Sequence, residues 1–255
     1  MDHTREHRSL LASAEKRLLL AIAQRLPRSL SSDHLSLLGL LSMPVAGLAF
    51  SRIGSTRWSV AVLAMALLAN WFGDSLDGTV ARVRHQERPR YGFYVDHVID
   101  LVGTAALLAG MGASGRMEPS IALAVLAAYF LVSAETYLAT HAAGIFRLSF
   151  AGIGPTELRI LIAAGAFYAA GHPWVELAGV HVRLLDVSGL VAVAGLAIVF
   201  VASAIGNTRA LYLAEPLPRR PEDPGRRPET PLRPFPLIHG RAEELRVESQ
   251  PVSPC

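Results

Sequence analysis

Four aspartates within one short stretch are the residues of this chain best suited to chemistry. They are Asp74, Asp77, Asp96 and Asp100. The first pair is spaced i, i+3 and the second i, i+4, so on helices each pair shares one face. Apolar runs flank the stretch on both sides, and acids at or inside a membrane are costly and usually functional. Because two divalent cations balance four carboxylates, the cluster favours a two-metal site.

The residues around the aspartates point to a phosphate-containing substrate. Hard oxygen ligands suit Mg²⁺ or Mn²⁺ better than Zn²⁺, and Mg²⁺ usually also binds substrate phosphate. Arg82 follows one turn after the first pair and can pair with a phosphate. Gly78 and Ala81 leave room for a ligand close to the backbone. The stretch therefore predicts phosphoryl-group substitution, with an acid acting as general base for an attacking hydroxyl.

The composition places these residues in a membrane. The chain has 255 residues, of which 51% are hydrophobic and 18% charged. The apolar excess lies in long runs, which predicts an all-α integral membrane protein. The formal net charge of +3 does not indicate a nucleic-acid partner, because the basic residues lie at span ends and in the tails without aromatic interleaving.

Six apolar runs are near the length that crosses a bilayer. They cover roughly residues 34–51, 58–82, 92–112, 120–143, 156–171 and 187–208. No segment shows a β pattern or an internal repeat. Antiparallel return of the second and third spans would bring their acid faces together.

An amphipathic helix over residues 10–26 is expected to precede the six spans. It fits a membrane surface, and a short helix packed on the protein itself fits equally well. We expect three regions: the N-terminal segment 1–30, a catalytic domain of six transmembrane helices over 31–212, and a disordered tail over 213–255. The tail from about 215 holds ten of the 16 prolines and few large apolar groups.

The basic residues predict the orientation. Only four of the 24 Lys and Arg residues lie on one side of the predicted spans: Arg52, Arg57, Arg116 and Arg183. Positive charge concentrates on the cytoplasmic side of membrane proteins. We therefore expect both termini and the aspartates to face the cytoplasm.

The stretch 74–100 resembles the signature of the CDP-alcohol phosphotransferase family of integral membrane enzymes, D-x2-D-G-x2-A-R-x9-G-x3-D-x3-D. The likeness extends over about residues 10 to 210, although Asp33 and His34 stand where many relatives carry Pro-Asn. The matching residues are Asp74, Asp77, Gly78, Ala81, Arg82, Gly92, Asp96 and Asp100.

The resemblance implies transfer of a phospho-alcohol group from a CDP-linked alcohol to an acceptor alcohol, with release of CMP, in phospholipid synthesis. It implies that Asp74, Asp77, Asp96 and Asp100 hold two Mg²⁺ or Mn²⁺ ions and that Asp100 is also the base. It assigns Gly78, Ala81, Arg82 and Gly92 to the CDP site. Relatives are commonly dimers, so a homodimer is a possible assembly.

A second polar segment, residues 133–160, is a candidate site for the acceptor alcohol or a lipid phosphate. Its candidates are Glu135, Tyr137, Arg147 and Arg159. A salt bridge within the membrane that pairs Glu135 or Glu157 with these arginines is an equally good interpretation. The segment faintly resembles the choline/ethanolamine branch, which uses diacylglycerol as acceptor. The short chain favours bacterial-type enzymes, which mostly use CDP-diacylglycerol and a small polar alcohol. A divalent-cation transporter remains the alternative of another class.

Overall fold

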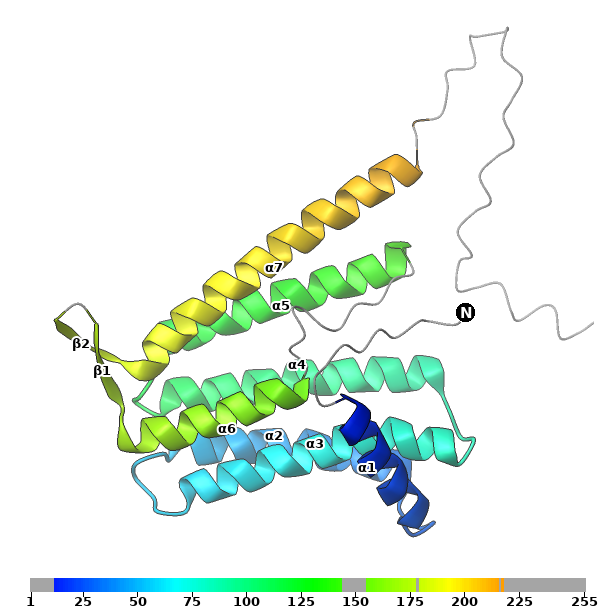
Figure 1. Cartoon of the computed structure of the whole chain (residues 1–255), viewed down its shortest axis with the longest axis horizontal. Coiled ribbons are helices and arrows are strands. Elements are labelled where there is room, and N and C mark those ends of the chain that lie inside the picture. Colours follow the sequence, from blue (N-terminus) through cyan, green and yellow to red (C-terminus); the bar gives the residue numbers. More distant parts are fainter. Residues whose placement is uncertain (1–11, 144–154, 178, 216, 218–255) are drawn as a thin grey trace, which may run out of the picture. The chain divides into compact units, whose positions relative to one another are not determined.

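Long apolar helices make up most of the fold (Figure 1). The computed structural model describes residues 12–143, 155–177, 179–215 and 217. The helices are α1 (Ala12–Arg25), α2 (Ser32–Ser51), α3 (Ser59–Val83), α4 (Pro89–Ala113), α5 (Pro119–Ala143), α6 (Pro155–Gly171) and α7 (Leu184–Ala214). They confirm the predicted helical membrane architecture, in which one further helix precedes the long apolar helices. Arg147 and most of the Pro-rich tail lie outside the described residues.

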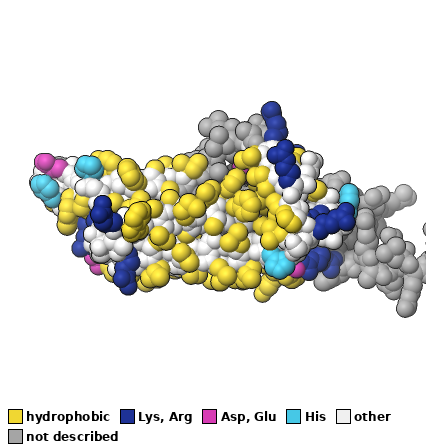
Figure 2. Space-filling model, turned by 90° about the horizontal axis from the view of Figure 1, so that it is seen from below, with side chains coloured by type: hydrophobic (Ala, Val, Ile, Leu, Met, Phe, Trp, Pro, Cys, Tyr) yellow, Lys and Arg dark blue, Asp and Glu magenta, His cyan; other side chains and the backbone are white. Residues whose placement is uncertain are grey.

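Five helices, α2, α3, α4, α5 and α7, are long and apolar enough to cross a membrane. The helix at the fifth predicted span, α6, is shorter at 17 residues. Local sequence explains several helix starts: α4, α5 and α6 each begin with proline, which suits the first helical turn because it has no N–H to leave unpaired. The face in Figure 2 is apolar over its middle, with charged side chains toward its ends, as a bilayer requires.

Glycines let α2 pack very closely against α3 and α4. A Cβ at Gly73 of α3 would come within 2.5 Å of the Leu35 carbonyl oxygen of α2. A Cβ at Gly110 of α4 would come within 2.0 Å of the Gly47 carbonyl oxygen. Small residues permit such close backbone contact between membrane helices. The three helices therefore form one unit that holds the aspartate-bearing parts of α3 and α4 beside the start of α2.

The N-terminal helix α1 packs against α3. Leu19 and Ala23 of α1 are buried in one cluster with Leu76 and Val80 of α3, whereas Leu18 is 51% exposed. The helix thus contacts the protein on one side and offers apolar surface on another, which combines the two interpretations left open by the sequence.

Arg84 fastens the segment that links α1 to α2. Its guanidinium donates to the backbone carbonyls of Leu26, Pro27 and Leu30 at 3.2, 2.9 and 2.6 Å. The link is therefore held against the end of α3, next to the start of α2.

The expectation that the chain has no β structure is wrong. Strands β1 (Trp174–Leu177) and β2 (Val180–Arg183) form an antiparallel hairpin between α6 and α7. Gly179 lies in its turn with φ of 81°, a conformation that glycine adopts without strain. Strands of four residues are too short for their alternation to stand out in the sequence.

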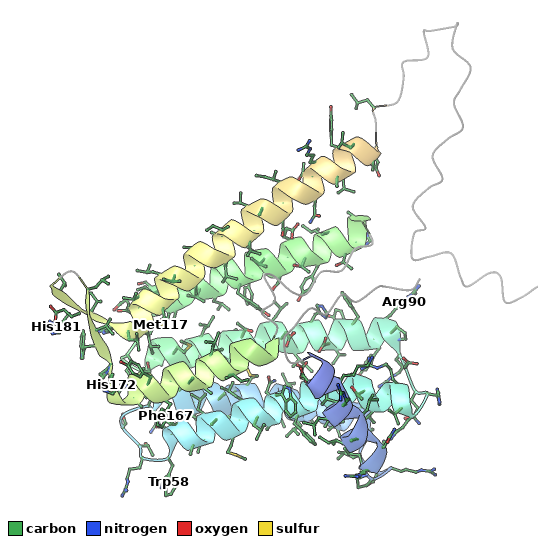
Figure 3. The ribbon with its side chains drawn as sticks, viewed as in Figure 1. Trp58, Arg90, Met117, Phe167, His172 and His181 are labelled. Atoms are coloured by element: carbon green, nitrogen blue, oxygen red, sulfur yellow. The ribbon has the colours of Figure 1, made fainter. Side chains whose placement is uncertain are left out.

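Arg116 ties together the loops at the end of the helices that carries the hairpin. Its guanidinium donates to the carbonyl of Ile53, at 3.1 Å, and to that of Ala169. The connections after α2 and α4 and the last turns of α6 therefore meet here. Figure 3 shows Trp58, Met117, His172 and His181 at this end and Arg90 at the other.

Candidate metal and nucleotide site

Helices α3 and α4 bring the predicted aspartates close together. The carboxyl groups of Asp74 and Asp96 lie within hydrogen-bonding contact, and the charges of Asp77 and Asp100 also act on Asp96. All four side chains are partly buried rather than fully solvated. Carboxylates this close repel one another unless a proton or a cation lies between them. The cluster is therefore a place where positive charge is favoured.

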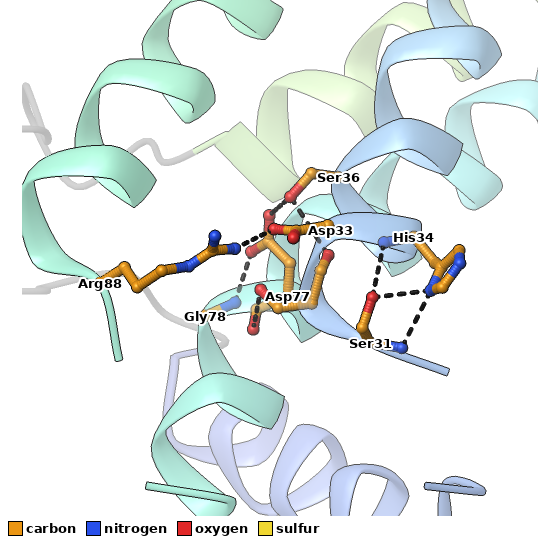
Figure 4. A network of polar contacts seen from close by, with 8 residues as sticks. Ser31, Asp33, His34, Ser36, Asp77, Gly78 and Arg88 are labelled. Atoms are coloured by element: carbon orange, nitrogen blue, oxygen red, sulfur yellow. Dashed lines mark hydrogen bonds and ion pairs between the residues drawn. The ribbon is translucent and has the colours of Figure 1, made fainter. Parts of the chain in front are cut away.

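Two serines of α2 hold Asp77 (Figure 4). The Ser36 hydroxyl donates to Asp77 Oδ2 at 2.6 Å, and the Ser32 hydroxyl donates to the Asp77 carbonyl oxygen at 3.0 Å. The Gly78 backbone N–H donates to the other carboxylate oxygen, Oδ1. Neither serine stands out in the sequence, since their link to Asp77 arises from the close packing of α2 on α3.

The start of α2 and the α3–α4 connection enclose an open cavity of about 440 Å³. Arg88 forms an ion pair with Asp33 across it and lies 4.1 Å from the centre of the Tyr91 ring. Ser31 caps α2 through a reciprocal pair of bonds with His34 (Figure 4). Asp33 and His34, which depart from the family pattern, thus support the local fold beside the aspartates.

The donor chemistry of the aspartates fits a hard divalent cation, because every candidate ligand is a carboxylate oxygen. Among the described residues, however, no three His, Cys, Asp or Glu side chains are arranged to hold a metal ion. One reason is that the Asp77 carboxylate already accepts hydrogen bonds from the Ser36 hydroxyl and the Gly78 N–H. The helices therefore bring suitable donors to one region, where the carboxyl groups of Asp74 and Asp96 are the pair in direct contact.

The predicted nucleotide residues border the same cluster. Arg82 donates to the Thr79 hydroxyl at 3.1 Å, and its charge acts on Asp77. A Cβ at Gly92 would meet nothing within 4 Å, and one at Gly78 would meet only the Arg82 guanidinium at 3.6 Å. Ala81, which lies between the two glycines in the sequence, is partly buried. Backbone at both glycines is thus open to a ligand.

The predicted acceptor residues divide into two groups. Tyr137 lies near the cluster: its hydroxyl bonds with Ser133, and the charges of Asp96 and Asp100 act on it. Glu135 instead accepts from the Asn207 amide of α7 at 2.6 Å. Arg147 and the side chain of Arg159 lie outside the described residues.

His97 joins α4 to α5 beside the aspartates, which sequence reasoning missed. Its ring stacks on Phe93 with centroids 4.1 Å apart and meets the Tyr137 ring edge-on at 5.0 Å. Its Nδ1 lies 2.7 Å from the Phe93 carbonyl oxygen. The position between two predicted metal ligands is the only sequence signal that could have singled it out.

Comparison with known proteins identifies the family of this chain. The model of the CDP-alcohol phosphatidyltransferase family matches residues 30–206. No curated protein matches the chain. Two solved structures of the Mycobacterium tuberculosis phosphatidylinositol phosphate synthase PgsA1 share the fold, each at 20% identity. The one with CDP-DAG bound has a TM-score of 0.52 and covers 77% of this chain and 94% of its own. The one with manganese and citrate has a TM-score of 0.51, covering 76% and 88%.

The family match spans well over half of the chain and includes every residue of the aspartate stretch. It decides between an enzyme and a cation transporter, the alternative that intramembrane acids alone leave open. The chain belongs to the CDP-alcohol phosphatidyltransferase family and is an integral membrane CDP-alcohol phosphotransferase.

Proposed function

We propose that this enzyme transfers a phosphatidyl group from CDP-diacylglycerol to a small polar alcohol and releases CMP. The observation that carries the proposal is the contact between the carboxyl groups of Asp74 and Asp96, on which the charges of Asp77 and Asp100 also act. Arg82 lies beside this cluster, and the backbone at Gly78 and Gly92 is accessible to a ligand. A carboxylate cluster with an adjacent guanidinium suits metal-assisted chemistry on a diphosphate. The PgsA1 structure with CDP-DAG bound adds support for this donor.

We assign the metal ligands to Asp74, Asp77, Asp96 and Asp100, which would hold two Mg²⁺ or Mn²⁺ ions. Forming a shared ligand sphere requires the carboxylates to rotate on the same backbone, since no three of the described acids meet now. When bound, the ions would polarise phosphate oxygens and stabilise the leaving phosphate. The PgsA1 complex with manganese supports a divalent ion in this fold.

The protein side chains carry out the rest of the proposed reaction. Asp100 accepts the proton of the acceptor hydroxyl, and the oxygen then attacks the phosphorus of the phosphatidyl group. The bond from that phosphorus to the bridging oxygen of CMP breaks. Arg82 pairs with the diphosphate, and Gly78, Ala81 and Gly92 let the nucleotide approach the backbone. Tyr137 lies near Asp100 and would contact the acceptor.

A reconstituted assay with defined substrates tests the donor and acceptor. The purified chain in phospholipid nanodiscs with Mg²⁺ is given CDP-diacylglycerol and a panel of polar alcohols, including glycerol 3-phosphate, serine and inositol phosphate. We expect CMP release that requires one of these acceptors. Parallel reactions contain CDP-choline or CDP-ethanolamine with diacylglycerol. Turnover only in that second set would replace the proposal with the choline/ethanolamine-type reaction.

We also propose that the aspartate end and both termini face the cytoplasm of a bacterial-type cell, because only four of the 24 basic residues lie on the other side. Cys255 is the single cysteine and provides the test. A membrane-impermeant maleimide should leave it unlabelled in intact spheroplasts and label it after lysis. Labelling before lysis would reverse the orientation.

A further inference from the structure

The β1–β2 hairpin has one apolar face and one polar face. Its register pairs Val175 with Val182 and Leu177 with Val180, so four aliphatic side chains share a face. The opposite face carries three polar residues and one aromatic residue, since Trp174 pairs with Arg183 and Glu176 pairs with His181. Leu177 and Val180 are 58% and 59% exposed. A two-stranded ribbon cannot bury such a face by itself.

Ion pairs and hydrogen bonds hold the polar face of the hairpin to the ends of the helices. Arg183 lies 3.2 Å from Glu118 and 3.9 Å from Asp186, and Asp186 accepts from the Glu118 backbone N–H at 2.6 Å. The Leu184 N–H donates to the Pro173 carbonyl at 3.0 Å and closes the base. The aliphatic face is thereby directed away from these charges.

The hairpin cannot lie far from the bilayer surface. It is joined directly to α6, which ends at Gly171, and to α7, which begins at Leu184. The apolar run of α7 starts right after Asp186. A strand of four residues reaches only about 13 Å. The exposed Leu177 and Val180 therefore lie within that reach of the end of a membrane-spanning helix.

We propose that the hairpin is a lipid-docking element in the leaflet opposite the aspartate site. The aliphatic face of Val175, Leu177, Val180 and Val182 lies against the boundary between headgroups and acyl chains. Trp174, stacked 5.9 Å from the Arg183 guanidinium, lies at headgroup level, where amphipathic rings and cations are favoured. This assignment depends only on the hairpin and the membrane helices, and it does not rest on the proposed reaction.

Depth-dependent quenching tests the proposal on adjacent residues that point to opposite faces. In a Cys255→Ser background, Val180→Cys and His181→Cys are each labelled with an NBD fluorophore and reconstituted into phosphatidylcholine liposomes. Some liposomes carry a doxyl quencher near the top of the acyl chain. Leu177→Cys and Glu176→Cys form a second matched pair on the other strand.

The Val180 and Leu177 labels should show blue-shifted emission and roughly threefold stronger quenching than the His181 and Glu176 labels, because only the aliphatic face enters the acyl boundary. Equal quenching on both faces would overturn the proposal. So would a Val180 label that is shielded from water yet not quenched by lipid. Energy transfer between differently labelled chains in that case would identify a second copy as the occupant.

Discussion

The charged side chains at the two ends of the helices have different kinds of partner. At the end that carries the hairpin, two arginines have partners that hold loops: Arg116 bonds with two carbonyls, and Arg183 faces Glu118 and Asp186. At the other end, the charges of three further carboxylates act on Asp96. The first arrangement holds loops in place. The second keeps like charges together, which costs stability unless a cation joins them.

From this difference we infer which end of the helices binds a ligand. Groups matched one to one explain a fold, whereas a gathering of like charges on rigid helices is explained best by a ligand. The close contacts of Gly73 and Gly110 with α2 supply the rigidity that keeps the carboxylates together. Substitutions at the two ends should therefore have different consequences, one mainly on activity and the other on stability.

The largest expected effect is that of Asp100→Asn. Loss of the proposed base should lower the rate of CMP release by at least about 10²-fold. The amide has nearly the same size, so the variant should insert and keep its melting temperature. CMP release is measured in nanodiscs with saturating CDP-diacylglycerol. Turnover at the wild-type rate would remove Asp100 from the proton transfer.

A smaller effect is expected for Ser36→Ala, which removes the hydrogen bond to Asp77 Oδ2. Loss of a group that orients a metal ligand typically lowers metal affinity by about 10- to 100-fold. Mn²⁺ affinity is followed by electron paramagnetic resonance, independently of turnover. Ser36→Thr should restore it.

Ser42→Ala is the matched control for Ser36, because Ser42 lies on the same helix and its hydroxyl donates to the Leu38 carbonyl of that helix at 2.6 Å. It should leave Mn²⁺ affinity unchanged. If both alanine variants bind Mn²⁺ like the wild type, Ser36 has no part in positioning Asp77.

The smallest effect on activity is expected for Arg116→Met. The carbonyls of Ile53 and Ala169 lose their donor, which should lower the free energy of unfolding by about 1–3 kcal/mol. CMP release per folded molecule should stay at the wild-type level. Exposed Arg57, at the same end, is the control, and Arg57→Met should change neither quantity. A drop in turnover with unchanged stability would contradict the division between the two ends.

The sequence predicted the long helices and the grouping of the aspartates, because both leave strong local signals. Apolar runs of bilayer length located α2 through α5 and α7, and proline and basic residues marked their ends. The spacing of the aspartates identified the cluster because i, i+3 and i, i+4 pairs share a helix face.

What the sequence did not reveal depends on contacts between distant segments. Ser36 reaches Asp77 only because glycine lets the backbones of α2 and α3 approach each other closely. The bond between Glu135 and Asn207 joins residues far apart in the chain. The hairpin was missed because strands of four residues carry too little periodicity.

A Mn²⁺ titration of the purified chain, followed by electron paramagnetic resonance with and without CMP, tests the metal site between α3 and α4. We expect two bound ions per chain. Asp74→Asn combined with Asp96→Asn should remove this binding, while the melting temperature of the apoprotein is maintained or rises because repulsion between the two carboxylates is relieved. Wild-type Mn²⁺ binding by that double variant would contradict a metal site between α3 and α4.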